Sequence, residues 1–348
     1  MIFVTKGSPG RVCLVPDPVD FCIAQDMVAI RANPAKVYPA YLFAALRSRQ
    51  IQERIEGMHV GTMIPHFRKG DFGKLLIPVP DSRTQRFIGE MYLVLSRKMD
   101  HNRRMNQTLE SLARAIFKSW FVDFDPVVAK AAGKKPLGMS AQTAALFPDR
   151  FQDSPLGPIP KGWRAGSVAD IARYVNGRNF TKNASGAGRM VVRIAELNSG
   201  PGRSTVYNEV AADPKNTAYP GDLLFSWSGS LNVYRWHGDE ALVNQHIFKV
   251  VCETYPQWFV HHHLREAMPF FQGIAADKAT TMGHIKREHI AQAEVAFPPM
   301  SVVQGADRII GPLYDRIHRT ERQCAALATL RDALLPQLMS GELRVKLG

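Results

Sequence analysis

The chain has 348 residues, an apolar fraction of 45% and a charged fraction of 22%, which is typical of a globular protein with room for two domains. Its 44 lysines and arginines outnumber its 31 aspartates and glutamates, and the formal net charge of +13 favours a polyanionic partner such as nucleic acid. No apolar run is long enough to cross a bilayer, the N-terminus lacks a secretory pattern, and the four cysteines form no C-x-x-C pair. A cytoplasmic protein without a metal site or a disulfide framework is therefore expected.

The first 80 residues predict a mixed unit of short strands and a helix. Apolar runs over residues 12–15 and 27–30 have the length and composition of strands. Residues 39–55 carry apolar side chains at helical spacing behind a proline, which is tolerated in the first turn of a helix. Residues 75–79 predict another strand, which Pro80 ends because proline cannot donate a ladder hydrogen bond.

Residues 82–121 predict a single long helix. Apolar side chains recur along it at steps of three and four residues, and neither proline nor glycine interrupts it after Gly89. Ser82 is the expected N-cap, because its hydroxyl can accept a bond from an unpaired backbone N–H. A helix of about forty residues is roughly 60 Å long, and such a stripe is typical of a helix that packs against another long helix.

A connector rich in proline and glycine follows over residues 122–163, and only a short helix over residues 141–146 is expected within it. A second mixed unit begins after it. Its predicted strands are residues 191–194, 223–227 and 247–251. Residues 258–274 predict a helix that Pro269 kinks or splits.

A second long helix is predicted over residues 301–339, and Pro336 and Gly341 are expected to end it. The chain thus presents one order of elements twice, and short stretches of sequence repeat with it. The matched stretches are residues 1–7 with 223–229, 24–30 with 244–250, and 66–69 with 284–287. A duplicated unit indicates a protein that reads two sites more often than one with a single active site.

Four stretches resemble the conserved segments of type I restriction–modification specificity subunits, and they occur in the order found in that family. They are residues 109–127, the connector stretches 144–148 and 159–163, residues 244–249, and residues 334–343. The resemblance covers essentially the whole chain. It also implies two DNA-reading domains, called readers below, of which the first lacks its N-terminal part, because no counterpart of residues 162–220 precedes residue 1.

The resemblance implies an α/β fold with two target-recognition domains. Each is expected to be a mixed, largely antiparallel sheet with helices, and two long conserved helices forming an antiparallel coiled coil join them. The implied boundaries are 1–81 for the end of the first reader, 82–125 for the central helix, 126–163 for the connector, 164–299 for the second reader and 300–342 for the distal helix.

The implied function is sequence-specific recognition of a bipartite DNA target, without catalysis and without a cofactor. The implied partners are double-stranded DNA, the methyltransferase (modification) subunits that methylate adenine, and the restriction (motor and nuclease) subunits. Hydrophobic positions on the long helices are the expected partner contacts: Leu109, Leu112, Phe117, Trp120, Phe121, Leu330, Leu334 and Leu335. One added helical turn, about 5.4 Å, is expected to lengthen the spacer between half-sites by about 1.5 base pairs.

Polar and basic segments of the second unit carry the side chains that contact phosphates and base edges. The expected contacts there are Arg178, Asn179, Lys182, Ser226, Trp227, Ser228, Asn232, Arg235, Lys278, Thr280, Thr281, His284, Lys286 and Arg287. Those expected in the first unit are Lys6, Arg11, Thr62, His66, Arg68 and Lys69. Such loops are also common as solvated turns, and Trp227 is equally compatible with a core position.

Two alternatives remain open at this point. Asp213-Pro214-Lys215, with Asp149 as an upstream partner, offers the D-x-K fragment of many nucleases, although such a tripeptide is common by chance. A truncated specificity subunit could instead act as an assembly or decoy protein that occupies its partners without directing them to DNA. Mg²⁺-dependent cutting would indicate the first alternative, and tight partner binding with sequence-blind DNA binding would indicate the second.

Overall fold

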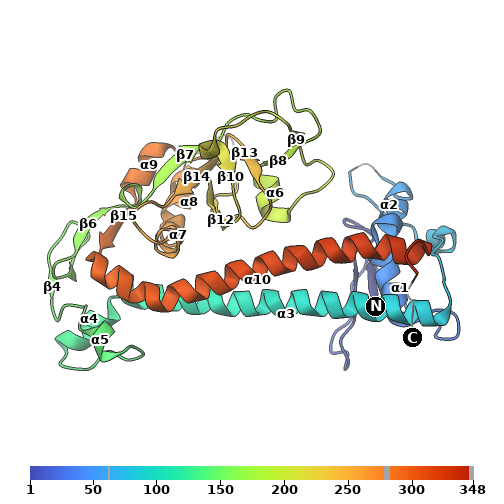
Figure 1. Cartoon of the computed structure of the whole chain (residues 1–348), viewed down its shortest axis with the longest axis horizontal. Helices are drawn as coiled ribbons and strands as arrows, with labels where there is room; N and C mark the ends of the chain where they lie inside the picture. Colours follow the sequence, from blue (N-terminus) through green and yellow to red (C-terminus); the bar gives the residue numbers. More distant parts are fainter. Residues whose placement is uncertain (62, 278–282, 345–348) are drawn as a thin grey trace. The chain divides into compact units, whose positions relative to one another are not determined.

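The computed structural model describes residues 1–61, 63–277 and 283–344, and the chain divides into two compact units. Unit 1 comprises Met1–Arg104 with Gln323–Gly348, and unit 2 comprises Met105–Arg322. Two long helices, α3 (Ser82–Phe121) and α10 (Met300–Ser340), each contribute one end to unit 1 and the other to unit 2 (Figure 1). Within the described ranges, no helix is long and apolar enough to cross a membrane.

Unit 1 is built on a small antiparallel sheet of order β2-β1-β3. Its strands are β1 (Ile2–Val4), β2 (Val12–Cys13) and β3 (Met27–Ala29). The expected helix over residues 39–55 is two helices, α1 (Pro39–Arg47) and α2 (Arg49–Gly57), because Ser48 is extended and its hydroxyl caps α2 at the Ile51 N–H. The strand predicted over residues 75–79 was wrong. A 3₁₀ helix over Lys69–Lys74 leads instead into irregular backbone there.

The core of unit 1 joins α1 and α2 to the ends of both long helices. Tyr41 and Phe67 are fully buried in it, and Leu335 and Leu338 of α10 pack into the same cluster. At Gly89 a Cβ atom would lie 2.6 Å from the Tyr41 backbone nitrogen, so only glycine allows α3 to approach α1 this closely.

Both long helices form as predicted, but their ends differ from expectation. Asp81, not Ser82, caps α3, since its carboxylate accepts bonds from the Arg83 and Thr84 N–H groups at 3.0 Å. The expectation that Pro336 ends the second helix was wrong, because α10 continues to Ser340 with Pro336 on its exposed face, where water can hydrate the carbonyl that proline leaves unpaired. Gly341, at φ 78°, ends it.

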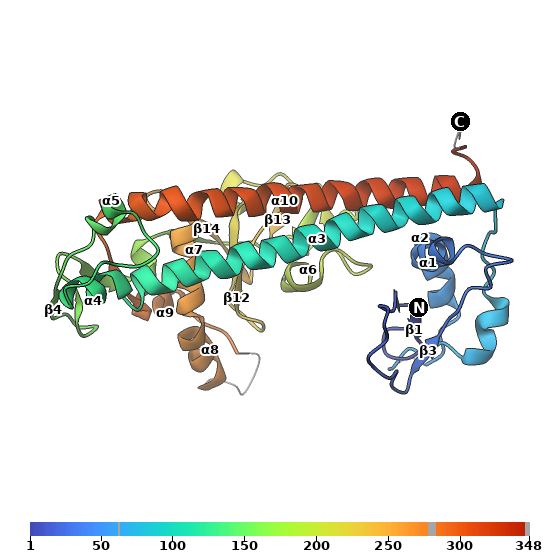
Figure 2. The same ribbon diagram turned by 90° about the horizontal axis from the view of Figure 1, so that it is seen from below.

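The two helices run antiparallel and lie side by side within each unit (Figures 1 and 2). Residue numbers rise along α3 as they fall along α10. The contacts that show this are Cys324 with the Met99 carbonyl, Asn102 with Gln323 at 2.9 Å, and Asn106 with Glu321 at 2.6 Å. Asn102 and Asn106 are buried, so these two amides fix the register of the pair.

The connector of unit 2 follows the end of α3, and there the structure adds a helix that was not expected. This helix, α4 (Asp125–Ala131), starts after Phe124, whose left-handed φ of 56° turns the chain out of α3. Pro126 then lies in its first turn, where proline is tolerated. The predicted short helix is present as α5 (Ala141–Ala144), and β4 (Phe151–Gln152) pairs with β5 (Ile159–Pro160) before the reader begins.

Within its described residues, the reader portion of unit 2 contains two four-stranded sheets and one two-stranded sheet. The first has the order β12-β11-β14-β7, with β7 (Arg173–Asn176), β11 (Leu223–Ser226), β12 (Asn232–Arg235) and β14 (Ile247–Val251) all antiparallel. The second has the order β10-β13-β8-β9, with β8 (Arg189–Val192), β9 (Tyr207–Asn208), β10 (Thr217–Ala218) and β13 (Ala241–Val243). β6 (Arg164–Ser167) pairs with β15 (Glu294–Phe297).

Four further short α-helices lie in the described part of unit 2. They are α6 (Ile194–Ser199), α7 (Gln257–Glu266), α8 (Met268–Asp277) and α9 (Arg287–Gln292). The helix predicted over residues 258–274 is split as expected, at Ala267, so that Pro269 lies in the first turn of α8. Trp258 and Phe259 of α7 pack on Phe117 and Phe121 of α3, which joins this portion to the long helices.

Candidate nucleic-acid interface

The repeated sequence forms the same backbone arrangement in both units. In unit 2, Gly229 N–H donates to the Gly283 carbonyl at 2.9 Å, and Ile285 N–H donates to the Trp227 carbonyl at 2.9 Å. In unit 1 the corresponding bonds run from Gly7 to Pro65 at 3.0 Å and from Phe67 to Thr5 at 2.7 Å. The residue pairs between them, Ser228 with His284 and Lys6 with His66, form matching antiparallel bridges.

The sheets behind these bridges share their register as well. Phe225 pairs with Phe248 in unit 2, and Phe3 pairs with Val28 at the equivalent place in unit 1. The short segment after each bridge then has one buried apolar residue, Ile285 or Phe67, followed by two exposed basic residues. Those basic pairs are Lys286 with Arg287, and Arg68 with Lys69. The repeat therefore places a histidine and two cations beside the end of a strand twice.

In unit 2 this segment lines a groove of about 700 Å³. The groove is formed by β7, the turn at Lys215, Trp227, Phe248 and the residues from His284 to Arg287. Arg287 also donates a hydrogen bond from Nη2 to the Tyr174 carbonyl, which fixes the start of α9 against β7. Cations, aromatic rings and one side-chain amide thus share one open surface, the combination that contacts phosphates and base edges.

Trp227 lines this groove and packs against the edge of the core of unit 2. Its ring is half-buried and lies 5.9 Å from the ring of Phe248 and 5.2 Å from that of His246. Its indole Nε1–H donates to Asn176 Oδ1 at 3.1 Å. Asn176 is exposed at the end of β7, and the prediction of individual contacts from the sequence missed it, as it missed Arg173 and Lys215 in the same groove.

Lys215 is held in the groove by a structured turn. Asp213 caps this turn by accepting the Lys215 N–H at 2.9 Å, and the Lys215 hydrogen bonds, together with the charges of Lys215 and Arg178, hold the pKa of Asp213 below its usual value. The buried Lys249 fixes the turn from below by donating to the Thr217 carbonyl at 2.7 Å and pairing with Asp222 at 2.8 Å. The Asp213-Pro214-Lys215 fragment therefore has a capping role that explains it without nuclease chemistry.

The remaining predicted contacts of unit 2 are of two kinds: side chains exposed to solvent, and side chains buried in contacts within the protein. Arg178, Asn179 and Lys182 are exposed on the loop after β7, and Ser228, Asn232, Lys286 and Arg287 also reach the surface. Ser226 was a wrong prediction: it is fully buried, and its hydroxyl donates to the Ser230 carbonyl at 2.6 Å to close the β11–β12 turn.

Arg235 was also wrong as a DNA contact. Its side chain is only 5% exposed and pairs with Glu110 of α3 at 2.6 Å. Its guanidinium lies 4.6 Å from the ring centre of Tyr314 on α10. The charge that the sequence presented as free for DNA is therefore used to attach β12 to the long helices.

Four predicted contacts lie outside the described residues: Thr62, Lys278, Thr280 and Thr281. The rest of the unit 1 set is described. Lys6, Arg68 and Lys69 are exposed around the half-buried His66, whereas Arg11 lies at the entrance to β2 and lines a separate hollow with Arg47 and Gln52.

The hydrophobic residues expected to contact partner subunits are mostly interior. Phe117, Trp120 and Phe121 belong to the core of unit 2, and Leu335 to that of unit 1, so these four predictions were wrong. A stripe of apolar residues on a helix predicts that this face is buried, but it does not indicate whether the same chain or a partner subunit packs against it. Leu112 and Leu330 are each 48% exposed, and Leu109 and Leu334 are half-buried.

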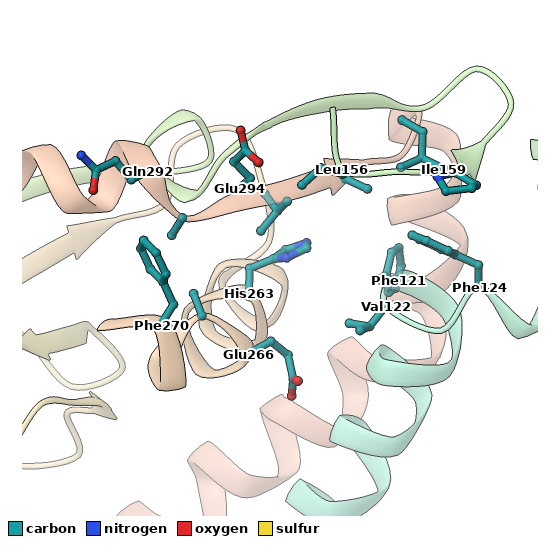
Figure 3. Close-up of a pocket in the computed structure, with 15 residues that line it drawn as sticks. Phe121, Val122, Phe124, Leu156, Ile159, His263, Glu266, Phe270, Gln292 and Glu294 are labelled. Atoms are coloured by element: carbon teal, nitrogen blue, oxygen red, sulfur yellow. The ribbon is translucent and has the colours of Figure 1, made fainter. Parts of the chain in front are cut away.

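A second cavity, of about 520 Å³, lies between α7, the end of α3 and the connector (Figure 3). His263 points into it, with Phe121 and Phe124 on one side and Phe270 on the other (Figure 3). Burial lowers the pKa of His263 to about 3, so the imidazole is neutral near neutral pH. Nothing in the predicted DNA-contact set lines this cavity, which separates it from the basic groove.

Comparisons with known proteins point to one class of protein. A model of the type I restriction modification DNA specificity domain matches residues 1–111. The type I restriction enzyme MjaIX specificity subunit of Methanocaldococcus jannaschii is 25% identical over 365 residues, covering 99% of this chain and 78% of the relative. The HindI specificity subunit of Haemophilus influenzae is 23% identical over 400 residues, covering 97% and 85%.

The fold is also similar to that of a solved structure, the S subunit of a type I restriction–modification system from M. genitalium. The two share a TM-score of 0.56 at 16% identity, over 97% of this chain and 82% of the other. The family match over residues 1–111 and the two relatives that align along nearly the whole chain support similarity to the specificity subunits of type I restriction enzymes.

Proposed function

We propose that the chain recognises a bipartite DNA sequence through its two bridged segments, one in each unit, and directs the chemistry of partner subunits to it. The observation that carries this proposal is the repeat itself. The Lys6–His66 and Ser228–His284 bridges have the same hydrogen bonds, and each is followed by two exposed cations. Two equivalent surfaces suit a target with two half-sites, whereas a single active site would not require the duplication.

In unit 2 the groove divides the work of recognition. The cations Lys215, Lys286 and Arg287 are suited to phosphates, which position the protein without reading sequence. Asn176 and Trp227 present a polar edge and a ring near the same surface, which are suited to the edges of bases. The net charge of +13 supplies the attraction that brings DNA to these surfaces.

The family supplies the class of partner, and we propose modification subunits that methylate adenine and restriction subunits that move along and cut DNA. Their contacts on this chain must use exposed positions, because the buried aromatic residues of α3 are unavailable. Leu112 on α3 and Leu330 on α10 are the exposed apolar positions of the predicted set. We propose that residues 1–81 and 164–299 act as the two readers and that α3 and α10 set the spacing between half-sites.

The test is the set of methylated adenines in a methylation-free host that expresses this chain with its cognate modification subunit. A bipartite motif is expected for the unaltered chain. The double substitution Lys286→Ala with Arg287→Ala is expected to weaken DNA binding across all sequences and to reduce the salt dependence by about two phosphate contacts. Lys134→Ala with Lys135→Ala removes two exposed charges on the connector and serves as the matched control. Equal weakening by both pairs would contradict the proposed groove.

A further inference from the structure

We propose that Asn176 reads one base of the target by donating a hydrogen bond from its amide nitrogen, and that Trp227 determines which end of the amide faces the DNA. This inference rests on the proposed function, because it assigns a specificity-determining residue to the groove in unit 2. Asn176 begins the polar segment 176–183 that the sequence assigned to DNA contact, although it was not among the individual contacts expected there. Its selection comes from three observations on its side chain, its backbone and the surface that surrounds it.

The first observation is the hydrogen bond between the two side chains. Trp227 Nε1 lies 3.1 Å from Asn176 Oδ1. An indole nitrogen is a donor only, so the amide oxygen must face the ring and the amide nitrogen must face away from it. The orientation of this amide is thus determined by chemistry, because the reversed amide would bring its own N–H donors against the indole N–H. Among the described residues, none accepts a hydrogen bond from Asn176 Nδ2.

The second observation is the rigidity of the frame that carries both residues. The Asn176 carbonyl accepts a bond from Asn216 Nδ2 at 2.9 Å, and the next N–H, of Gly177, donates to the Ile247 carbonyl at 2.9 Å. A Cβ at Gly177 would lie 2.1 Å from the Asn244 carbonyl oxygen, so the chain passes here against a neighbouring backbone with no room to shift. The backbone of Trp227 is fixed on both sides, by bonds to His246 and Ile285.

The third observation is the surface around the amide. Asn176 and Trp227 line the groove together with Lys215, Lys286 and Arg287. Cations around a polar group of fixed direction are the arrangement in which phosphates set the position and one side chain reads a base. A second asparagine of unit 2, Asn198 on α6, accepts a bond from Tyr234 Oη at 2.6 Å and lines no part of this groove.

The direction of the amide predicts what it reads. Guanine and thymine present acceptors in the major groove, at O6 and N7 or at O4, and adenine presents N7, whereas cytosine presents an amino donor. Two N–H groups directed at the base edge favour a base that presents an acceptor. Opposite cytosine, these donors would face the donor amino group of the base. The position read by Asn176 is therefore expected to disfavour cytosine by about tenfold, the effect of one such hydrogen bond.

Three variants of the full chain, assayed in complex with the modification subunit, test the assignment through the methylated motif. Asn176→Ala is expected to make one position of the motif degenerate. Asn176→Asp keeps the bond from Trp227 but presents an acceptor, so it is expected to shift that position towards cytosine. Trp227→Phe removes the donor that orients the amide and is expected to relax the same position by about tenfold while the rest of the motif is kept.

Asn198→Ala and Tyr234→Phe are the matched controls, because they break an equivalent aromatic–asparagine bond elsewhere in unit 2. Both are expected to leave the motif unchanged. An unchanged motif with Asn176→Ala and Asn176→Asp would overturn the inference while leaving the proposed function intact. A wild-type chain that directs no motif at all would overturn the proposed function and this inference with it.

Discussion

The ion pair between Glu110 of α3 and Arg235 of β12 has one buried and one exposed member, and this asymmetry predicts an unusual order of mutational effects. Arg235 is 5% exposed, whereas Glu110 is 41% exposed, and their charged atoms are 2.6 Å apart. Removing Glu110 leaves a buried guanidinium without its counter-charge. Removing Arg235 leaves a carboxylate that water can reach.

The magnitudes follow from that difference. Loss of the partner of a buried charge costs about 3–5 kcal/mol. Glu110→Ala should fall at the low end, about 3 kcal/mol, because the Tyr314 ring stays 4.6 Å from the guanidinium. Arg235→Met fills the site with an apolar chain of similar length and should cost about 1 kcal/mol or less. The double variant should resemble Arg235→Met, so it should be more stable than Glu110→Ala alone.

Urea unfolding followed by tryptophan fluorescence measures these free energies. The exposed pair of Arg173 with Glu253, at 2.8 Å and with side chains 55% and 63% exposed, provides the control, and Glu253→Ala should cost about 0.5 kcal/mol or less. Equal destabilisation by Arg235→Met and Glu110→Ala, or simple addition of the two losses in the double variant, would contradict the predicted order of effects.

Three further predictions concern the histidines and the long helices. Burial lowers the pKa values of His262 and His263 to about 3, below the unfolded value near 6.5. The unfolded chain therefore binds protons before the folded chain does as the pH falls. The free energy of unfolding should drop by about 1.4 kcal/mol per pH unit for each histidine between about pH 6.5 and pH 3. His263→Leu should reduce that slope in urea titrations at pH 7.5 and 5.5, and an unchanged slope would contradict the assignment. Replacing the buried Asn102 and Asn106 by leucine should raise the unfolding midpoint while loosening the register of α3 on α10. Disulfide trapping between cysteine pairs placed in shifted registers would detect the loosened pairing. Trapping only in the native register would contradict the role of the two asparagines in fixing the register. Four residues inserted in α3 after Asn106, with four more opposite them in α10, should add about 6 Å of helix and lengthen the unread spacer of the motif by about two base pairs. An insertion in α3 alone should disrupt the pairing of the two helices. An unchanged spacer in the doubly extended chain would refute this role of the helices.

The amino-acid sequence by itself determined the long-period features of this protein. The apolar spacing in residues 82–121 and 301–339 was sufficient to predict α3 and α10, because a continuous helix depends on local periodicity and on the absence of early breaks. The matched stretches were sufficient to predict a duplicated unit, and the Ser228–His284 and Lys6–His66 bridges confirm it. Like sequences adopt like registers because alternation decides which face of a strand is buried.

Only the tertiary structure decided what each side chain does. Arg235 and Lys286 look alike in sequence, but one is enclosed by Glu110 and Tyr314 while the other reaches solvent. Phe117 carried the apolar signal expected of a partner surface, and α7 of the same chain covers it. Asn176 was distinguished from the rest of its polar segment only by folding, which brings Trp227, 51 residues away, to its amide oxygen. Periodicity and composition report that a residue is apolar or charged, whereas its partner is chosen by contacts between segments distant in the chain, and local pattern carries no record of those contacts.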